Sequence, residues 1–484
     1  MSESLGLPTE DRLLDASRKQ ARGRVGLFSI GLAAYWPQFP GLKERLEEYA
    51  RLVAARVEAW ADVVPAGRVD DADGARTAGD LFAREGVDLI LLHTATYATS
   101  SQVLPAVQRA KVPVVILNLQ PIAALDYPNT DTGEWLANCS ACCAPELAGA
   151  FSRAEINYQV VSGLLTDVDE SRAWQEVRNW CRAAGAVRAL REARIGFLGH
   201  TYPGMLDMYS DYTQHHAQLG LHIEVLEMDD LQAHVETVSD QSLEATLAES
   251  RAMFELDSSV HEDGLRWSAK VAAAMDALVA ERRLDGMAYY YRGHGTFEEL
   301  GASLILGGSR LTARGIPCAG EGDLKNAVAM LIMDRLGAGG SFTEFYAMDL
   351  AEGFVLMGHD GPGHVAISDR RPILRGLGLY HGKAGQGVSV EFSVKTGPVT
   401  ILGLTQTADG RLKLLVAEGE SLPGEILHIG NTNSRLRFAL PPDEFVDRWC
   451  QEGPTHHVAL GLGHQAATIE KVGRLLGLET IVVR

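Results

Sequence analysis

The sequence predicts an α/β protein with two Rossmann-like domains containing parallel sheets, followed by a β-rich C-terminal domain with an antiparallel, barrel-like arrangement. Three observations support this prediction. Short apolar runs alternate with helical stretches over the first two thirds of the chain. Several of these runs end in polar residues or glycines, as strands do at the ligand-binding edge of a parallel sheet. After Gly339-Gly340 helical periodicity fades, and short strands separated by turn residues take over.

The N-terminal domain is expected to cover residues 24–190, after a polar tail at residues 1–23. Apolar strands are predicted at 24–31, 61–64, 87–92 and 112–117, separated by helical stretches at 42–57, 77–84 and 103–110, and a long helical region follows from about 144 to 190. Two of these strands end in polar side chains, His93 and Gln120. Both are therefore candidates for hydrogen bonds to substrate hydroxyls.

The central domain is expected to cover residues 191–340 and to repeat this alternation. Strands are predicted at 194–200, 222–226, 286–291 and 315–319, with helical stretches at 242–282 and 324–336. His200 ends the first of these strands. Arg292 and His294 follow the third strand. All three could contact a polar ligand at the carboxyl edge of the sheet.

The C-terminal domain is expected to cover residues 341–484 as a sheet or barrel of short antiparallel strands. The predicted strands are 354–357, 387–394, 399–405, 412–418 and 424–429, and a final helix and strand close the chain at 465–484. Segments such as Thr396-Gly397-Pro398 and Ala408-Asp409-Gly410 supply the turns between them.

Charge and composition exclude some classes of partner. The formal net charge is -19, from 44 basic and 63 acidic residues. This balance argues against a broad surface for nucleic acid or anionic membrane. The apolar runs are too short to span a bilayer. Residues 1–23 lack the apolar core of a signal peptide, which predicts a cytoplasmic protein.

The six cysteines do not predict a disulfide framework. Cys139, Cys142 and Cys143 lie close together, and a zinc site is one interpretation of them. No second cysteine pair at ligand spacing accompanies them. The favoured interpretation is thiols packed in a helix.

The most informative motif is Gly320-Glu321-Gly322-Asp323, directly after an apolar strand-like run. The flanking glycines allow a sharp turn and a close approach by a ligand. Three further segments carry Glu344, His359 and the pair His456-His457. Together they predict a divalent-metal site. A mixed set of oxygen and nitrogen ligands suits Mn²⁺, Mg²⁺ or Co²⁺, and zinc stays open.

Two choices within this motif set remain open in the sequence. His364 follows His359 within the same glycine-rich turn and competes with it as a ligand. His456 and His457 are adjacent, and neighbouring side chains of an extended segment point to opposite faces. At most one of them is therefore expected to join a given site. Glu321 and Glu344 could serve both as ligands and as general bases.

With these motifs in place, the chain resembles the L-arabinose isomerase and L-fucose isomerase superfamily. The resemblance rests on residues 319–327, on Gly340-Ser341-Phe342-Thr343-Glu344, on Gly358-His359 and on Thr455-His456-His457, in the family order. It implies that Glu321, Glu344, His359 and His457 bind a divalent metal, usually manganese. It also implies that the two glutamates form the acid/base pair, and that the protein is a homotrimer or homohexamer.

The leading hypothesis is a metal-dependent aldose–ketose isomerase that acts on an open-chain sugar through an enediolate. His93, Gln120, His200, Arg292, His294, His364 and His456 are the candidate substrate contacts. The alternative is an epimerase, or a lyase or decarboxylase, on a sugar acid, which a basic residue such as Arg292 would favour. A third hypothesis is a non-catalytic sugar-binding protein, which predicts lost metal ligands.

Overall fold

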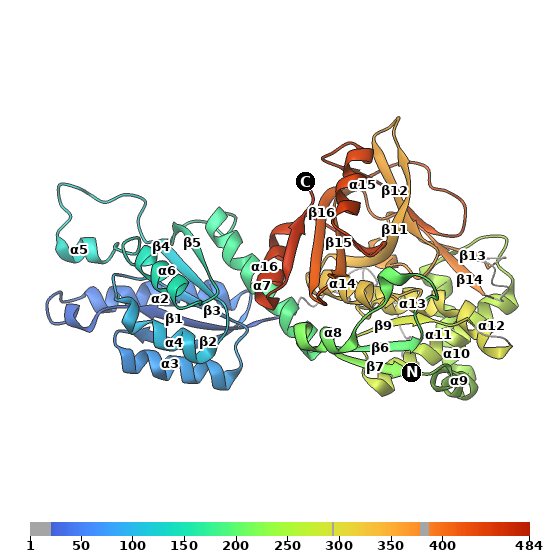
Figure 1. Ribbon diagram of the computed structural model, residues 1–484, viewed down its shortest axis with the longest axis horizontal. Coiled ribbons are helices and arrows are strands. Elements are labelled where there is room, and N and C mark those ends of the chain that lie inside the picture. Colours follow the sequence, from blue (N-terminus) through green and yellow to red (C-terminus); the bar gives the residue numbers. More distant parts are fainter. Residues whose placement is uncertain (1–20, 293–294, 378–386) are drawn as a thin grey trace, which may run out of the picture. The chain divides into compact units, whose positions relative to one another are not determined.

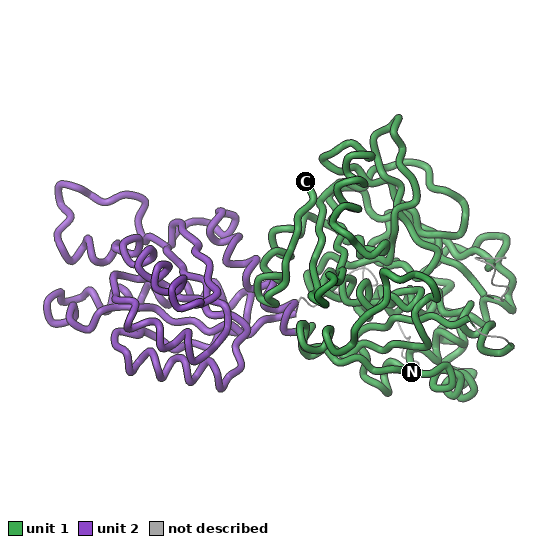
Figure 2. The backbone as a smooth tube through the Cα atoms, in the orientation of Figure 1, with its two compact units in different colours: residues 1–20, 189–484 green, residues 21–188 purple. Residues whose placement is uncertain are grey.

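The computed structural model describes residues 21–292, 295–377 and 387–484 (Figure 1). These residues form two compact units, one of residues 21–188 and the other of the described residues of 189–484 (Figure 2). The predicted division of the second unit into a central and a C-terminal domain at residue 340 stays a prediction.

The unit 21–188 is a parallel sheet with helices in its crossovers. The sheet order is β2-β1-β3-β4-β5, and every pairing is parallel. Its strands are β1 Arg24–Ile30, β2 Asp62–Val69, β3 Leu89–His93, β4 Val114–Gln120 and β5 Tyr158–Leu164. Its helices are α2 Leu42–Glu58, α3 Ala72–Glu85, α4 Leu104–Ala110, α5 Thr132–Leu136, α6 Cys143–Arg153 and α7 Arg172–Glu192, the last continuing past the end of the unit. The first three strands and helices lie close to their predicted positions.

The single helical region predicted for residues 144–190 is wrong. The edge strand β5 interrupts it and pairs with β4 over seven residues, from Val114↔Tyr158 to Gln120↔Leu164. The segment Tyr158-Gln159-Val160-Val161 carries the aromatic and β-branched residues that favour a strand. Helical residues on both sides of this short run concealed it in the sequence.

The three neighbouring cysteines also differ from the prediction of thiols in a packed helix. Cys139 and Cys142 are joined by a disulfide directly before α6. Cys143 keeps a free, buried thiol. Burial raises the pKa of that thiol to about 11. A zinc ion bound by all three sulfurs is therefore not the observed arrangement.

The unit 189–484 begins with a second parallel sheet in the order β10-β9-β6-β7. Its strands are β6 Arg194–Gly199, β7 His222–Leu226, β9 Gly286–Tyr290 and β10 Cys318–Ala319. The helices of this layer are α8 Tyr212–Leu219, α9 Met228–Thr237, α10 Asp240–Met253, α11 Glu262–Arg282, α12 Thr296–Ala302, α13 Leu304–Ala313 and α14 Leu324–Arg335. A parallel sheet in each unit confirms the predicted α/β class. The helical stretch expected at 242–282 is two helices, α10 and α11, separated by the short strand β8 Glu255–Leu256.

The C-terminal part of this unit contains a closed six-stranded antiparallel barrel, as the sequence predicts. The ring order is β15-β18-β11-β12-β17-β16, and β16 pairs back to β15. The strands are β11 Gly339–Asp349, β12 Phe354–His359, β15 Gly397–Gln406, β16 Leu412–Leu422, β17 Thr432–Phe438 and β18 His457–Leu462. Strand β19 Glu479–Val482 adds to β16 in parallel, and helices α15 Pro442–Gln451 and α16 Ala466–Leu476 accompany the barrel. A small sheet, β14-β13-β8, uses β13 Ile373–Gly376 and β14 Val388–Glu391.

The strand predicted at residues 424–429 is wrong, because these residues form a loop. The real strand, β17, begins at Thr432, after Gly430 in the left-handed region with a φ of 76°. The side chain of Asn433 holds the loop by accepting from the backbone N–H of Leu427 at 2.9 Å. The apolar pair Ile426-Leu427 resembles a strand locally, but the glycines at both ends break it.

Helix α14 joins the sheet to the barrel within this unit. Asp323 caps its start by accepting from the backbone N–H of Asn326 at 2.9 Å. Every residue from Leu324 to Asp334 is buried, because the helix packs against β9 of the sheet and against β11, β15 and β18 of the barrel. The turn that precedes α14 therefore lies between the end of β10 and the start of the helix that contacts both the sheet and the barrel. No helix in the described ranges is long and apolar enough to cross a membrane.

Candidate metal centre

Glu321 occupies a strained turn at the carboxyl end of β10. Its φ is +58°, a left-handed conformation that costs a residue other than glycine about 1–2 kcal/mol. The neighbouring Gly322 has a φ of +68°, and a Cβ there would lie 2.4 Å from the carbonyl oxygen of His200. Backbone bonds fix the turn, from Gly322 N–H to the Tyr289 carbonyl and from Tyr202 N–H to the Glu321 carbonyl. The direction in which the Glu321 side chain leaves the backbone is therefore fixed by this turn.

Register within the barrel brings the remaining predicted ligands together. Glu344 on β11 lies directly opposite His457 on β18 and opposite Gly358 on β12. His359 is the next residue after Gly358 and ends its strand. Directly opposed residues of antiparallel strands lie within about 5.5 Å of one another. Three segments that are distant in sequence thus deliver their side chains to one end of the barrel.

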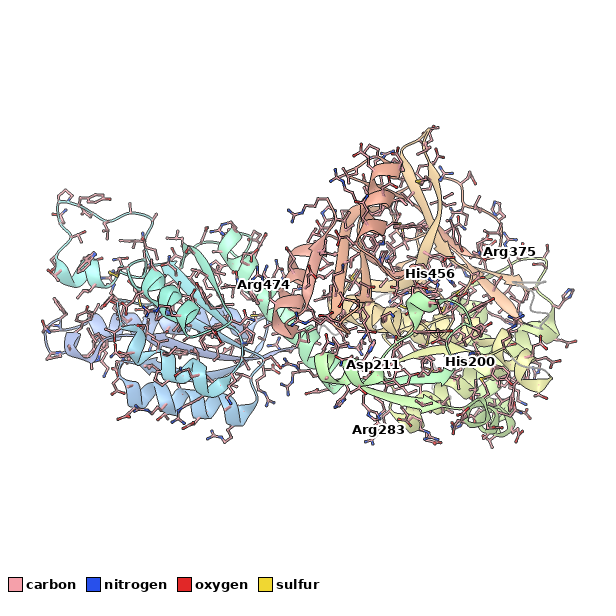
Figure 3. The ribbon with its side chains drawn as sticks, in the orientation of Figure 1. His200, Asp211, Arg283, Arg375, His456 and Arg474 are labelled. Carbon is pink, nitrogen blue, oxygen red and sulfur yellow. A yellow bond between two sulfur atoms is a disulfide. The ribbon has the colours of Figure 1, made fainter. Side chains whose placement is uncertain are left out.

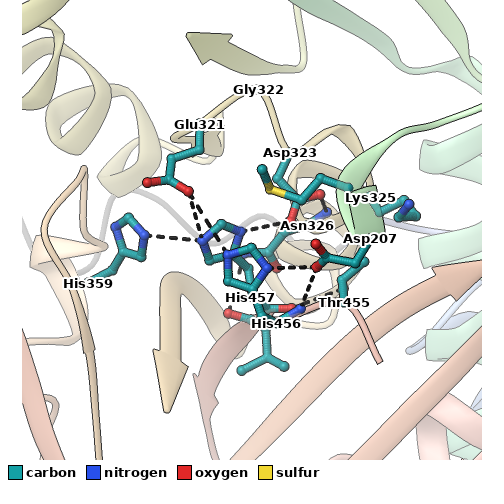
Figure 4. Close-up of polar contacts among 12 residues, drawn as sticks. Asp207, Glu321, Gly322, Asp323, Lys325, Asn326, His359, Thr455, His456 and His457 are labelled. Carbon is teal, nitrogen blue, oxygen red and sulfur yellow. Dashed lines mark hydrogen bonds and ion pairs between the residues drawn. The ribbon is translucent and has the colours of Figure 1, made fainter. Parts of the chain in front are cut away.

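Glu321, His359 and His457 lie around one small space (Figure 4), and Glu344 forms a ligand-spaced group with the same two histidines. The Nε2 atoms of His359 and His457 are 3.2 Å apart, and the Nε2 of His457 is 3.5 Å from Oε2 of Glu321. Glu344, His359 and His457 form one group whose ligand atoms lie within 4.8 Å of one another. Glu321 joins a second such group with His456 and His457, and a third with His359 and Asp360.

Buried neighbours orient both histidines. Nδ1 of His457 lies 3.0 Å from Oδ2 of Asp323, and both side chains are fully buried. The ring of Phe342 packs against both imidazoles, with centroids 4.2 Å from His359 and 4.4 Å from His457. Nδ1 of His359 faces two groups, the Asp360 carboxylate at 3.2 Å and the backbone N–H of Gly361 at 3.0 Å.

His456 reaches the same site as His457, so the prediction that at most one of them joins it is wrong. Their ring centroids are 3.9 Å apart, and Nε2 of His456 is 4.0 Å from Oε2 of Glu321. The alternation rule fails because β18 begins at His457, which leaves His456 in the preceding turn. Oδ2 of Asp207 accepts from Nδ1 of His456 at 2.6 Å.

The contact between Asp207 and His456 shifts the pKa of each side chain toward its charged form. Burial raises the pKa of Asp207, but its hydrogen bonds from His456 outweigh burial and lower that pKa to about 2. Burial lowers the pKa of His456, and the bond and charge of Asp207 outweigh it, so that the net shift is upward. The pair is thus held together electrostatically.

Comparison with known proteins agrees with this geometry. Residues 209–339 match the L-arabinose isomerase central domain, and residues 374–484 match the L-fucose isomerase C-terminal domain. An L-arabinose isomerase from Nocardioides sp. is 23% identical over 92% of this chain and 91% of its own length. A sulfoquinovose isomerase from Alkalicoccus urumqiensis is 24% identical over 82% of this chain and 86% of its own. An L-arabinose isomerase from Acidothermus cellulolyticus is 25% identical over 77% and 75%.

The chain belongs to the arabinose and fucose isomerase superfamily. Each of the two family matches contains one of the four candidate ligands, and the other two lie between the matches. Glu321 lies inside the first match and His457 inside the second, whereas Glu344 and His359 fall in the segment between the two. The barrel register described above connects that segment to the second matched region.

Tyrosine side chains line one side of the site. A cavity of about 60 Å³ is lined by Tyr202, Tyr289, Tyr290, Glu321 and His359 among others. The ring of Tyr202 lies 4.7 Å from that of Tyr290. Burial, followed by the charge of Tyr202, raises the pKa of Tyr290 to about 12, so that its hydroxyl stays protonated. The wall is polar but uncharged.

Two other predicted contacts, His200 and Arg292, lie in or beside the sheet of the same unit. His200 is half-buried, with Nδ1 2.8 Å from the Thr201 carbonyl and its ring edge-on to Tyr290. Arg292 is exposed after β9. His294 lies outside the described residues.

His364 does not reach the four-ligand space. It is 1% exposed, its ring packs beside Gly339, and its Nε2 is 3.9 Å from Oδ1 of Asp334. Of the two histidines that competed in the sequence, the geometry therefore favours His359 as the ligand.

His93 and Gln120 belong to the unit 21–188, at the carboxyl ends of β3 and β4. His93 is fully buried, with Nδ1 3.0 Å from Oγ of Ser29 at the end of β1. Its burial lowers its pKa to about 4. The amide nitrogen of Gln120 donates to the carbonyl of Ile122.

Sequence reasoning missed four residues that shape the site: Asp207, Asp323, Phe342 and Asp360. Asp323 and Phe342 stood inside motifs that were recognised, but their neighbours in space were unknown. Asp323 is an N-cap by position, which concealed its second contact with His457. Asp207 carries no local signal, because 249 residues separate it from its partner His456.

Proposed function

We propose that this protein is a metal-dependent aldose–ketose isomerase whose site is built from Glu321, Glu344, His359 and His457. The observation that carries the proposal is the close approach of two imidazole nitrogens, 3.2 Å apart, with the carboxylates of Glu344 and Glu321 each at ligand spacing from both imidazoles. Membership of a superfamily that contains sugar isomerases supports the same reaction class.

The residues present fit a divalent cation. Ligands at right angles around an ion, each about 2.1 Å from it, lie about 3 Å apart, close to the observed 3.2 and 3.5 Å. Oε2 of Glu321 is buried and has no hydrogen-bond donor among the described residues. Such an atom is costly to bury unless a cation or donor satisfies it. A mixed nitrogen and oxygen set suits Mn²⁺, with Mg²⁺ or Co²⁺ as alternatives.

Proton positions on the imidazoles are consistent with this role. His457 donates Nδ1–H to Asp323, which leaves the lone pair of Nε2 directed at the site. Nδ1 of His359 lies 3.2 Å from the Asp360 carboxylate and also accepts from the backbone N–H of Gly361 at 3.0 Å, so these contacts do not fix its tautomer. The carboxylate behind His457 favours the tautomer that a metal requires.

The two glutamates are positioned to move the proton of the isomerisation. When bound, the ion supplies Lewis-acid polarisation of the sugar carbonyl, which lowers the cost of an enediolate. Glu344 removes a proton from the carbon next to the carbonyl, and Glu321 takes the proton of the hydroxyl on that carbon and returns it to the neighbouring carbon. The proton on Glu344 then passes to the former carbonyl oxygen, so that both carboxylates are restored. Phe342 and the tyrosines cover one side of the site and limit the access of water from that side.

Charge in the site favours a neutral sugar over a sugar acid. Glu321, Glu344 and Asp360 meet at the ligand groups, and Asp207 and Asp323 stand directly behind them. An anionic substrate group at this position would be repelled. The alternative of an epimerase or lyase on a sugar acid therefore has no supporting contact at the ligand cluster itself.

Proton exchange in D₂O tests the proposal. Mn²⁺-loaded protein is incubated with a panel of aldoses, ketoses and sugar acids, and the C1 and C2 protons are followed by NMR. We expect deuterium to enter one aldose–ketose pair, and Glu344→Gln to abolish its entry. The matched control is Glu352→Gln, an exposed glutamate on the turn that follows the same strand, which should leave exchange unchanged. Turnover of a sugar acid, with no exchange in any neutral sugar, would overturn the proposal.

A further inference from the structure

The disulfide between Cys139 and Cys142 lies directly before α6 in the unit 21–188 (Figure 3). Its two sulfurs differ in access, because Cys142 is exposed whereas Cys139 is buried. A thiol in solution therefore meets this disulfide at the Cys142 side. Disulfides that are exposed exchange with other thiols more readily than those inside a protein.

The segment around the disulfide has other contacts that keep it in place. Thr96 Oγ1 donates to the carbonyl of Leu136 at 2.7 Å, and Nη2 of Arg45 donates to Oε1 of Glu134 at 3.0 Å. The two cysteines are only three positions apart, and a disulfide that closes such a short ring removes little entropy from the unfolded chain. We therefore expect the disulfide to open without unfolding of the unit.

The backbone keeps the two cysteines close together when their disulfide is open. The carbonyl of Ser140, which lies between them in the chain, accepts from the N–H groups of Cys143 at 3.3 Å and Ala144 at 3.4 Å. Cys142 is the N-cap of α6, and the unpaired N–H groups of a first helical turn favour a thiolate. The open pair is thus arranged to close again.

The third cysteine of this group does not compete for either sulfur. Cys143 is fully buried, and its Sγ donates to the carbonyl of Ala98 at 3.1 Å. Burial raises the pKa of this thiol to about 11, so that it stays protonated at neutral pH. Because the thiolate is the nucleophile in disulfide exchange, the reaction is confined to Cys139 and Cys142.

We propose that Cys139 and Cys142 form a reversible thiol–disulfide exchange site, which small thiols such as glutathione enter at Cys142. This inference goes beyond the proposed isomerase function and does not depend on it. The site changes between a closed disulfide and two thiols while the protein stays folded.

The reduction takes place in two exchange steps. The thiolate of one glutathione attacks Sγ of Cys142, and the electron pair of the broken S–S bond leaves with Sγ of Cys139, which takes a proton from water. A second glutathione thiolate attacks the glutathione sulfur of the mixed disulfide and releases Cys142 as a thiolate, which is then protonated. Two glutathione molecules are oxidised to their disulfide, and the two cysteines gain two electrons and two protons.

Equilibration with glutathione is the first test. Folded, full-length protein is incubated in buffers of reduced and oxidised glutathione, quenched with acid, alkylated in denaturant and mapped by mass spectrometry. We expect the disulfide to be closed in oxidised glutathione and open in reduced glutathione, with an unchanged far-UV circular dichroism spectrum. The ratio of open to closed protein should rise with the square of the reduced glutathione concentration. A pair that stays closed in reduced glutathione, or stays open in oxidised glutathione, would overturn the inference.

Serine variants test the point of entry. In Cys139→Ser, oxidised glutathione should form a mixed disulfide at Cys142, because that sulfur is exposed. In Cys142→Ser, the same reaction at the buried Cys139 should be at least about tenfold slower. Both variants also carry Cys450→Ser, which removes the other exposed cysteine of the chain. Equal rates at the two positions, or faster reaction at Cys139, would show that small thiols do not enter at Cys142.

The matched control is Cys143→Ser, which changes the neighbouring cysteine. Serine still offers a donor to the carbonyl of Ala98, so we expect the same ratio of open to closed protein as in wild type at every glutathione ratio. A disulfide of Cys143 with Cys139 or Cys142 in wild-type protein would overturn the assignment of the pair. None of these measurements uses isomerase activity, so their outcome is independent of the proposed function.

Discussion

At the scale of the residue, neighbouring side chains hold the imidazoles of the site in place. His457 is hydrogen-bonded to Asp323, and His456 to Asp207. Phe342 packs against His359 and His457. The carboxylate of Glu321 is aimed by a left-handed backbone that few residues tolerate. Outer contacts of this kind orient ligands and strengthen metal binding.

Replacement of Phe342 by leucine should loosen both imidazoles. We expect the affinity for Mn²⁺ to fall about tenfold, because the ring contacts at 4.2 and 4.4 Å are lost while every ligand remains. Isothermal titration calorimetry on metal-depleted protein measures this. The matched control is Phe354→Leu, a buried phenylalanine of β12 that contacts Arg435. An equal loss of affinity in both variants would contradict the supporting role of Phe342.

His93 should make the unit 21–188 less stable in acid. Burial lowers its folded pKa to about 4, whereas the unfolded chain binds a proton near 6.5. The stability is therefore complete above pH 6.5 and is lost progressively as the pH falls toward 4, by about 2 kcal/mol at pH 5.

Urea unfolding of the full chain at pH 7.5 and pH 5 checks this prediction. The transition of the unit 21–188 should lose less stability between the two pH values in His93→Gln than in wild type, because glutamine does not titrate. An identical pH dependence in both proteins would show that His93 is not the group responsible.

At the scale of the element, strand register brings together residues that are far apart in the sequence. Glu344 meets His457 and Gly358 because β11 lies between β18 and β12 in the barrel. The turn at Glu321 is brought to the same place by α14, which packs on both layers. Single-residue changes in register would flip these side chains to the other face of the sheet.

Gly358 is the position where this register is most sensitive to side-chain size. A Cβ there would lie 1.9 Å from the carbonyl oxygen of Thr432 on β17. We expect Gly358→Ala to destabilise the barrel by about 2 kcal/mol or more and to weaken metal binding, since His359 is the next residue. Thermal unfolding and Mn²⁺ titration measure the two effects.

The matched control for that substitution is Gly403→Ala in β15 of the same barrel. A Cβ at residue 403 meets nothing closer than 3.4 Å, at Trp449, which is ordinary contact. If both alanine variants are equally stable and bind metal alike, the close approach of β17 to Gly358 does not govern the site.

The sequence predicted these elements unevenly, for physical reasons. Apolar strands buried on both faces, such as β3 and β4, were found because they read as continuous runs bounded by helices. The edge strand β5 was missed because it is only partly buried and lies between two helices. Residues 424–429 were mistaken for a strand, because local apolar character does not reveal which segment pairs with β12 and β16.

At the scale of the whole molecule, the sequence predicted the fold class but not the surroundings of the four candidate ligands, whose role as ligands stays a prediction. These candidates were identifiable because they sit in short motifs whose order resembles a known superfamily. The oriented pairs Asp207–His456 and Asp323–His457 depend on contacts across more than 100 residues, which no local pattern encodes. The expected homotrimer or homohexamer stays a prediction.

The most direct test of the four-ligand site is a titration of metal-depleted, full-length protein with Mn²⁺. We predict one ion per chain for wild type, and a loss of affinity of more than about 100-fold in both His359→Asn and His457→Asn. His364→Asn, another buried histidine of the same glycine-rich region, should bind like wild type if it is folded. Unchanged binding in folded His359→Asn and His457→Asn would contradict the account, because the ion would then lie elsewhere.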